Sequence, residues 1–378
     1  MSLFYRSARS ITMLAVSASC LAFAAPTAAA ADDGHRHGRD LTVQQVNLVS
    51  DLSTFGPSVL VDPDVVNPWG LTLGPTTPLW SANNGTDTAT LYASAPGATS
   101  ATKVTAVRVT FPDKPELPTG QVFNGSNGFV LSNATTSSPA RFIFSTITGR
   151  IAAWSPVIGP LQGDAQIKAT VPGAVYTGLA LATASTGPQL YAANFAQGRV
   201  DVFDSTFTLQ AASSKKFRDR DLPRGFSPFG IATLNGNVFV AYAKVDPATG
   251  RNAVGRGLGF VDEFTPDGRL VGRVASRHTL NAPWGMEIAP PGWGELAGDL
   301  LIGNFGDGRV NVIEAEHHGR FDGDFEGQLR DGSGRTLVIP GLWTLLRGTA
   351  TTGGTDSVWF SAGIDNERHG LIGVLRKP

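Results

Sequence analysis

The chain has 378 residues, and its 30 lysines and arginines against 31 aspartates and glutamates give a net charge of −1. This near-neutral balance argues against nucleic acid as a partner, because binding to phosphates requires concentrated basic charge. The 45 glycines are about 12% of the chain, above the roughly 7% that is usual, which indicates a protein with many tight turns.

The first residues have the pattern of an export signal. Arg6 and Arg9 precede an apolar run over 11–24, and four alanines at 28–31 supply a small-residue cleavage site. The apolar run is shorter than the roughly 20 residues that a membrane-spanning helix needs. We therefore predict a cleaved signal peptide over 1–31, a location in the periplasm or outside the cell, and no insertion into the membrane.

The segment after the signal is polar. Residues 32–40 contain His35 and His37 beside acidic residues, which predicts a disordered tail or, alternatively, a loose transition-metal site. The only cysteine, Cys20, lies inside the signal. The remaining chain thus has no disulfide, and burial and strand pairing must hold it together.

One unit then recurs six times between residues 41 and 378, at intervals of about 50 to 58 residues. Each unit begins with a short apolar segment, at 67–73, 128–131, 176–181, 227–232, 282–288 and 341–346. A hairpin with an Asn- and Gly-rich turn follows, at 79–92, 142–154, 190–203, 238–264, 300–313 and 358–375. A weaker fourth strand comes next, for example at 102–109, 270–274 and 325–329. Four antiparallel strands in each of six all-β units predict a single-domain, six-bladed β-propeller over 41–378.

The sixth unit ends before a fourth strand can form. The segment 43–49 near the start of the domain has strand character and no inner strand of its own. We expect it to pair with 371–375, which would close the ring and cover two exposed sheet edges.

The entries into several inner strands share a Pro-aromatic-Gly pattern, as at Pro68, Pro228 and Pro283. Proline lacks an amide donor and suits the first residue of a strand. Glycine lets neighbouring backbones approach closely around the axis. We expect the aromatic residue between them to fill the wider gap between blades.

Three motifs together resemble a known family: the entry at 67–70, the Gly-Asn-Phe-Gly-Asp-Gly-Arg-Val hairpin at 303–310, and the ending from Asp365 to Gly373. They are similar to those of an uncharacterised family of exported bacterial proteins with six repeats, some of which carry a C-terminal sorting tail of the PEP-CTERM kind. More distantly, the repeats resemble NHL-type and TolB-like six-bladed propellers, which include lactonases, quinoprotein dehydrogenases and binding modules. The resemblance implies a fold and no particular activity.

The turn between the second and third strands of each blade supplies candidate ligand residues. Asn83, Asn194 and Asn304 occupy one position of the repeat, and Thr146, Tyr242 and Ala362 occupy it in the other blades. We expect the three amides on one rim around the axis. Amide oxygens suit Ca²⁺ or a sugar hydroxyl, but asparagine is also a favoured turn residue. A ligand-binding ring and a set of structural turns are both open.

Glu287 is the only acid on the predicted inner strands, where its counterparts are Thr72, Val130, Ala180, Ala232 and Leu346. A carboxylate there is desolvated unless paired, which makes it a candidate functional group. The resemblance to metal-dependent lactonases implies a site for Ca²⁺ or another divalent cation at Glu287, Asn194, Asn304 and Asp365. It also implies Glu287 and Asp365 as candidate catalytic residues. The alternatives are an ion pair of Glu287 with Arg347 and a turn role for Asp365.

An enlarged hairpin in the fourth unit, 244–257, should stand over the same rim and present Lys244, Arg251 and Arg256. Long loops on rigid scaffolds often bind ligands, although a mobile, solvated loop explains the pattern equally well. The chain has no Gly-x-Ser-x-Gly elbow, no His-Glu-x-x-His motif and no phosphate-binding loop.

Three functions remain in view. The first is an exported, non-catalytic propeller that binds a protein or a small polar ligand, for example a carbohydrate, on its rim. The second is a divalent-metal hydrolase resembling a lactonase, with an axial site. The third is a structural component of the cell envelope or matrix.

Overall fold

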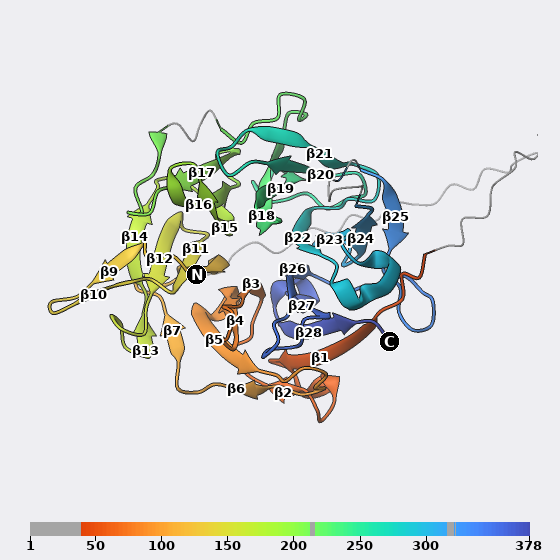
Figure 1. Ribbon diagram of the computed structural model, residues 1–378, viewed down its shortest axis with the longest axis horizontal. Coiled ribbons are helices and arrows are strands. Elements are labelled where there is room, and N and C mark those ends of the chain that lie inside the picture. The colour runs from red at the N-terminus through yellow and green to blue at the C-terminus, as the bar shows by residue number, and fades with distance from the viewer. Residues whose placement is uncertain (1–38, 212–215, 316–320, 322) are drawn as a thin grey trace, which may run out of the picture. The chain divides into compact units, whose positions relative to one another are not determined.

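The computed structural model describes residues 39–211, 216–315, 321 and 323–378. The predicted signal peptide and both tail histidines lie outside these residues. Arg39–Pro378 form one compact unit, in which six small, mostly antiparallel sheets are arranged in a ring (Figure 1). The unit is the six-bladed β-propeller that the repeats predict.

Each blade starts with its inner strand at the axis and continues outward. The first two blades contain β3 (Pro68–Thr72), β4 (Leu79–Asn83), β5 (Thr88–Ala93), β6 (Thr102–Lys103) and β7 (Arg108–Thr110), then β8 (Pro118–Phe123), β11 (Phe142–Thr146), β12 (Arg150–Trp154) and β14 (Gln166–Thr170). The third and fourth contain β15 (Tyr176–Ala184), β16 (Gly187–Asn194) and β17 (Arg199–Phe203), then β18 (Phe226–Leu234), β19 (Asn237–Lys244), β20 (Gly259–Phe264) and β21 (Leu270–Ser276). The last two contain β22 (Pro283–Ile288), β23 (Leu300–Asn304), β24 (Val310–Ile313) and β25 (Phe325–Gln328), then β26 (Leu342–Arg347), β27 (Ser357–Ala362) and β28 (Leu371–Arg376).

The remaining elements are short. β13 (Gln162–Asp164) joins the first blade parallel to β7, and β9 (Val130–Ser132) pairs with β10 (Ser137–Pro139) in a separate hairpin. The helical turns are η1 (Ser53–Phe55), η2 (Asn84–Thr86), η4 (Pro291–Leu296) and α1 (Ile364–Glu367). Among the described residues, no helix has the length and apolar character needed to cross a membrane.

The inner strand of the second blade was predicted wrongly. The predicted segment 128–131 overlaps β9, which pairs with β10, whereas the inner strand is β8. Phe129 and Leu131 are apolar because they pack in a cluster shared with the third blade, away from the axis. Val122 therefore replaces Val130 as the counterpart of Glu287.

The closure of the ring is confirmed. β1 (Gln44–Ser50) pairs antiparallel with β28, from Gln44 opposite Arg376 to Ser50 opposite Leu371. β2 (Leu60–Val61) then adds to β1 in parallel and covers part of its outer edge. The sixth blade is thus built from both ends of the domain, and no edge of β28 is left exposed to pair with another chain.

The inner strands crowd one another where their glycines lie. A Cβ built on Gly230 would lie 2.1 Å from the carbonyl oxygen of Trp284 in the next blade, and one on Gly120 would lie 2.2 Å from the amide nitrogen of Leu179. These separations are far below van der Waals contact, so only glycine lets the two backbones meet. The expectation of close approach at the axis is confirmed.

Side chains also connect neighbouring inner strands. The hydroxyl of Thr177 donates to the carbonyl of Phe229 at 2.8 Å, and the hydroxyl of Thr344 donates to the carbonyl of Trp69 at 2.7 Å. Adjacent blades share no backbone ladder at these points, so hydroxyl groups satisfy buried carbonyls that would otherwise have no partner.

The aromatic residues of the strand entries meet at the axis instead of filling the gaps between blades. Trp343 stacks between Trp69 and Phe305, with ring centroids 3.7 and 4.1 Å apart, and Trp284 meets Trp343 edge-on at 5.7 Å. Phe229 belongs to the same cluster. The entry residues Trp69, Phe229 and Trp284 each directly precede a glycine, and Trp343 precedes Thr344. Because the inner strands form a narrow ring, these four side chains meet at the axis. Together with Phe305 they form one central group, the aromatic plug.

Two aspartates before the first blade, Asp62 and Asp64, form ion pairs and hydrogen bonds with its outer strands. Lys103 Nζ lies 2.8 Å from both Asp62 Oδ1 and Asp64 Oδ2, and Arg108 binds Asp64 through two nitrogens, the shorter contact being 2.7 Å. The hydroxyl of buried Tyr92 donates to Asp62 at 2.6 Å. This network ties the segment after β2 to β5, β6 and β7.

We predict that Gly230→Ala lowers stability by about 1–3 kcal/mol, because the new methyl group forces two inner strands apart. The midpoint of urea or thermal unfolding measures the effect. Gly272→Ala in outer strand β21 is the matched control, since a Cβ there meets no atom within 4 Å. Equal midpoints for the two variants would contradict close packing at the axis.

The second prediction concerns acid stability. Hydrogen bonding to Arg108, together with Lys103, lowers the pKa of Asp64 from 3.8 to about 2. The folded-state pKa lies below the unfolded value, so the stabilisation is present above pH 3.8 and disappears as the pH falls through about 2. Asp64→Asn should lower the free energy of unfolding at pH 7 by up to about 2 kcal/mol.

The difference between wild type and Asp64→Asn should shrink steadily in denaturant titrations between pH 5 and pH 2. Asp113→Asn serves as control, because the side chain of Asp113 is 71% exposed in its ion pair with Arg150 and such pairs contribute little. A difference that does not change with pH would rule out the ionic origin of the stabilisation.

Candidate functional site

The repeat position of the rim asparagines is confirmed by strand register. Five of the six residues end the second strand of their blade and face the first residue of the inner strand; the pairs are Asn83 with Pro68, Thr146 with Pro118, Asn194 with Tyr176, Asn304 with Pro283, and Ala362 with Leu342. In the fourth blade both strands are two residues longer at this end, and Tyr242 faces Pro228, the third residue of β18. Amides therefore alternate around one rim of the propeller. Their role as ligands stays a prediction.

Asn194 is fully buried and uses its amide within the third blade. Its Nδ2 donates to Asp201 Oδ2 at 2.7 Å and to Gln197 Oε1 at 3.1 Å. Its Oδ1 accepts from the backbone amides of Val175 and Gln197 at 3.4 and 3.2 Å. The side chain thus joins the hairpin turn to the link that leads into the inner strand.

The other two amides have similar surroundings. Asn304 accepts from the backbone amide of Asn281 at 3.1 Å and donates to Thr279 and Asp307. Asn83 is bonded to hydroxyls of its own sheet, including Thr90 at 2.8 Å. All three asparagines are 0% exposed, and each bonds to groups of its own blade.

A pocket of about 540 Å³ opens on this rim beside the turns of the fifth and sixth blades. The long loop of the fourth blade contributes Arg251 and Asn252, and the turn of the fifth blade contributes Phe305 and Asp307. The link into the sixth blade and the segment 363–367 complete the wall. Of the predicted binding residues, Arg251 and Asp365 line this rim pocket.

One ion pair spans the rim pocket. Arg251 Nη2 lies 2.6 Å from Glu367 Oε1, and the second oxygen of Glu367 accepts from Asn67 Nδ2 at 3.0 Å. Asn67 in turn accepts from the indole nitrogen of Trp343 at 2.9 Å. The carboxylate of Glu367 therefore connects the fourth, sixth and first blades and rests on the aromatic plug.

The turn that carries Glu367 has an unusual backbone. Asp365, Asn366 and Glu367 have φ angles of 53°, 56° and 66°, so three consecutive non-glycine residues lie in the left-handed region. Each such residue costs of order 1–2 kcal/mol. All three residues line the rim pocket, so the strained part of the backbone forms part of the pocket wall.

The other two cations of the long loop bind elsewhere. Lys244 donates to the carbonyl of Arg224 at 3.1 Å and lies over the ring of Phe226. Arg256 donates to the carbonyl of His278 at 3.2 Å. Neither residue lines the rim pocket.

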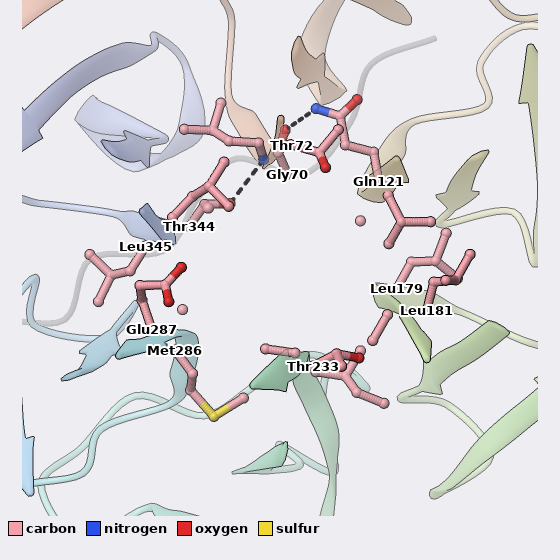
Figure 2. A pocket seen from close by; sticks show the side chains of 18 of the residues that line it. Gly70, Thr72, Gln121, Leu179, Leu181, Thr233, Met286, Glu287, Thr344 and Leu345 are labelled. Atoms are coloured by element: carbon pink, nitrogen blue, oxygen red, sulfur yellow. Dashed lines mark hydrogen bonds between the residues drawn. The ribbon is translucent and has the colours of Figure 1, made fainter. Parts of the chain in front are cut away.

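Glu287 faces a second space, the axial chamber, of about 240 Å³. Figure 2 shows its carboxylate pointing into this chamber, with Thr72, Gln121 and Leu179 across from it. The chamber is formed by the middle and later residues of all six inner strands. The aromatic plug separates it from the rim, since Trp284 lines the chamber and Phe305 lines the rim pocket.

The carboxylate of Glu287 is held by backbone groups. Its Oε2 accepts from the amide of Arg347 at 2.8 Å, and its Oε1 accepts from the amide of Ile288 at 2.9 Å. Burial raises the pKa of this carboxyl group above its ordinary value, while the two amide hydrogen bonds act in the opposite direction. Arg347 contacts Glu287 through its backbone amide instead of the ion pair considered from the sequence, and its exposed side chain is not part of the chamber wall.

The four residues considered as a metal site do not come together. Glu287 lines the axial chamber and Asp365 lines the rim pocket, while Asn194 and Asn304 line neither. Glu287 is the fifth residue of its inner strand and lies below the aromatic plug, whereas the turns lie above it. Within the described part of the chain, no cluster of three or more His, Cys, Asp or Glu is suited to hold a metal ion. A divalent cation stays a prediction from the sequence.

Sequence reasoning missed Asn67, Gln121 and Glu367. Asn67 and Glu367 belong to motifs that the sequence contains, but nothing there shows that the two side chains meet. Gln121 was missed with its strand. The spacing Pro118-Thr-Gly120, which matches Pro68-Trp-Gly70, was the signal that identifies this strand.

Comparison with known proteins gives two full-length relatives, both from Acanthamoeba polyphaga mimivirus. Uncharacterized protein R648 is 31% identical over 347 residues, covering 90% of this chain and 82% of that protein. Uncharacterized protein L690 is 33% identical over 325 residues, covering 84% of this chain and 81% of that protein. The chain belongs to the family of these two proteins. Both relatives are viral, and they give no support to a bacterial source or to export.

No family model matches the chain. Among solved structures, a streptogramin B lyase aligns with a TM-score of 0.50 and 12% identity, covering 88% of this chain and 97% of that one. A gluconolactonase from Xanthomonas campestris aligns with a TM-score of 0.42 and 14% identity, covering 85% and 98%. At these identities the likeness to the lyase shows the propeller fold alone.

We predict that Asn194→Ala destabilises the protein by about 2–3 kcal/mol, because it removes the acceptor of the backbone amides of Val175 and Gln197 and one of the donors to the buried carboxylate of Asp201. Thermal and denaturant midpoints measure the change. Asn127→Ala is the control, since Asn127 is exposed and such substitutions usually stay within about 0.5 kcal/mol. A stable Asn194→Ala variant would show that this amide is dispensable for the fold.

Proposed function

We propose that this protein is a non-catalytic binding module that holds a small polar ligand, of the carbohydrate class, in the rim pocket. The observation that carries the proposal is the pocket of about 540 Å³ into which three blades direct charged and amide side chains around the Arg251–Glu367 ion pair. Pockets that combine a few polar groups with apolar walls on a rigid scaffold are common ligand sites.

The lining suits hydroxyl-rich molecules. Asp307, Asp365 and Glu367 offer acceptors, while Arg251 and Asn252 offer donors. The apolar surfaces of Phe305, Val254 and Val338 supply the less polar contacts that the carbon face of a sugar ring requires. The strained turn at 365–367 supports the same proposal, because such strain is often retained where a side chain must be held for binding.

Export is part of the proposal. The charged start, the apolar run at 11–24 and the alanines at 28–31 support a signal peptide that would deliver the propeller to the periplasm or outside the cell. A small extracellular polar ligand is consistent with that location, and fusion of residues 1–40 to a reporter enzyme that is active only after export tests it.

The test of the rim pocket is Arg251→Ala. Screening the protein against immobilised glycans identifies a ligand, and calorimetry then measures its affinity. We expect Arg251→Ala to weaken binding about tenfold to a hundredfold, since a charge-assisted hydrogen bond contributes about 1.5–3 kcal/mol.

Arg256→Ala removes an equal charge from the same loop outside the pocket, and it should bind normally. Absence of any glycan ligand, or equal losses in both variants, would count against the rim pocket as a carbohydrate site.

A further inference from the structure

The axial chamber is a second space, and it shares no lining residue with the rim pocket. The aromatic plug closes one end of it, with Trp284 at the boundary. At about 240 Å³, the chamber has room for about eight water molecules or a ligand of about eight non-hydrogen atoms. Most of the residues that line it are aliphatic, although the side chains of Met286 and Leu345 are directed away from its centre (Figure 2).

The chamber offers negative charge and no positive charge. Among the described residues that line it, Glu287 is the only ionisable one, and none is Lys, Arg or His. The charge of Glu287 is oriented toward the space by the two backbone amides that hold it. Each carboxylate oxygen accepts one of these bonds and keeps a further lone pair for a ligand.

Two other polar side chains of the wall, Gln121 and Thr344, already donate hydrogen bonds to the protein. Gln121 Nε2 donates to the carbonyls of Gly70 and Trp80, both at 2.7 Å. The hydroxyl of Thr344 accepts from the amide of Leu71 at 3.1 Å and donates to a carbonyl. The hydroxyl oxygen of Thr233 and Gln121 Oε1 are both buried and have no hydrogen-bond partner.

A ligand that complements this lining must donate hydrogen bonds, carry positive charge and have a short apolar body. A negative charge in an apolar chamber is costly unless a cation pairs with it. A hard divalent ion is a poor match, because it requires six or more oxygen ligands and the chamber supplies one carboxylate. An anion is disfavoured by Glu287.

We propose that the axial chamber binds a small primary ammonium compound, whose charged group binds Glu287 and whose alkyl chain packs against the aliphatic part of the chamber wall. A primary ammonium group has three donors, which suits the free lone pairs of Glu287 and the unpartnered hydroxyl of Thr233. This site lies on the far side of the plug from the rim pocket and does not depend on the function proposed there.

The test uses n-butylammonium as probe, with 1-butanol as its uncharged analogue and butyrate as its anionic analogue. Calorimetry and ligand-observed NMR on the mature protein measure binding. We expect saturable binding of n-butylammonium, about tenfold or more stronger than that of 1-butanol, and no binding of butyrate.

Two variants locate the site. Glu287→Gln keeps the size of the side chain and removes its charge, and it should weaken n-butylammonium binding about tenfold or more. Ala232→Leu adds bulk to the chamber wall from another blade and leaves the charge of Glu287 in place, and it should abolish binding even if Glu287→Gln folds poorly. Asp365→Asn, in the rim pocket, is the control and should bind the probe as the wild type does.

Several results would overturn the proposal: no saturable binding of n-butylammonium, equal binding of 1-butanol, or full affinity in either chamber variant. If Asp365→Asn lost as much affinity for n-butylammonium as Glu287→Gln, the result would show that the probe binds in the rim pocket instead. A failed glycan screen leaves these outcomes unchanged, so the two sites are tested independently.

Discussion

The close approach of six inner strands around one axis is the constraint on which the rest of the structure depends. At Gly70, Gly120, Gly230 and Gly285 a Cβ would lie 2.1–2.5 Å from the backbone of the next blade. Because no side chain fits there, the residues on either side of the glycine must fill the axis. The residue before the glycine is aromatic in three blades, Trp343 precedes Thr344 at the same position of the sixth blade, and these four rings are the core of the plug. The residues after it leave the axial chamber open.

This division gives the propeller two unlike ends. Above the plug, loops of the fourth, fifth and sixth blades form a polar pocket whose carboxylate, Glu367, is fixed through Asn67 to the plug itself. Below the plug, the strands form an aliphatic chamber with one carboxylate. A rigid, buried aromatic group between the two spaces lets each have its own ligand chemistry, since neither shares a lining residue with the other.

Much of the fold could be predicted because packing imposes the same requirements on every repeat. The equivalence of Asn194 and Asn304, and the pairing of 43–49 with the last strand, follow from patterns that burial and strand register dictate. The second blade was misplaced because Phe129 is apolar for a different reason, packing against the third blade. The candidate site was harder to predict from the sequence. Alignment of the repeats places Glu287 on an inner strand and Asp365 in a turn, but it does not show that the aromatic plug lies between them.

Two places where the sequence departs from the repeat, Glu287 and the turn at 365–367, lie in the axial chamber and the rim pocket respectively. Glu287 stands where the other blades have Thr, Val, Ala, Ala and Leu, and the left-handed turn at 365–367 replaces the Asn-x-x-x-Gly turn of the third and fifth blades. Both departures carry a cost, in desolvation of a carboxylate or in backbone strain. Stability alone favours an uncharged residue at the position of Glu287, as in the other five blades, and a turn like that of the third and fifth blades. Backbone amides on Glu287, and Arg251 and Asn67 on Glu367, offset part of this cost. The ligands proposed for the two spaces would offset more of it, because a ligand that binds only the folded state stabilises that state.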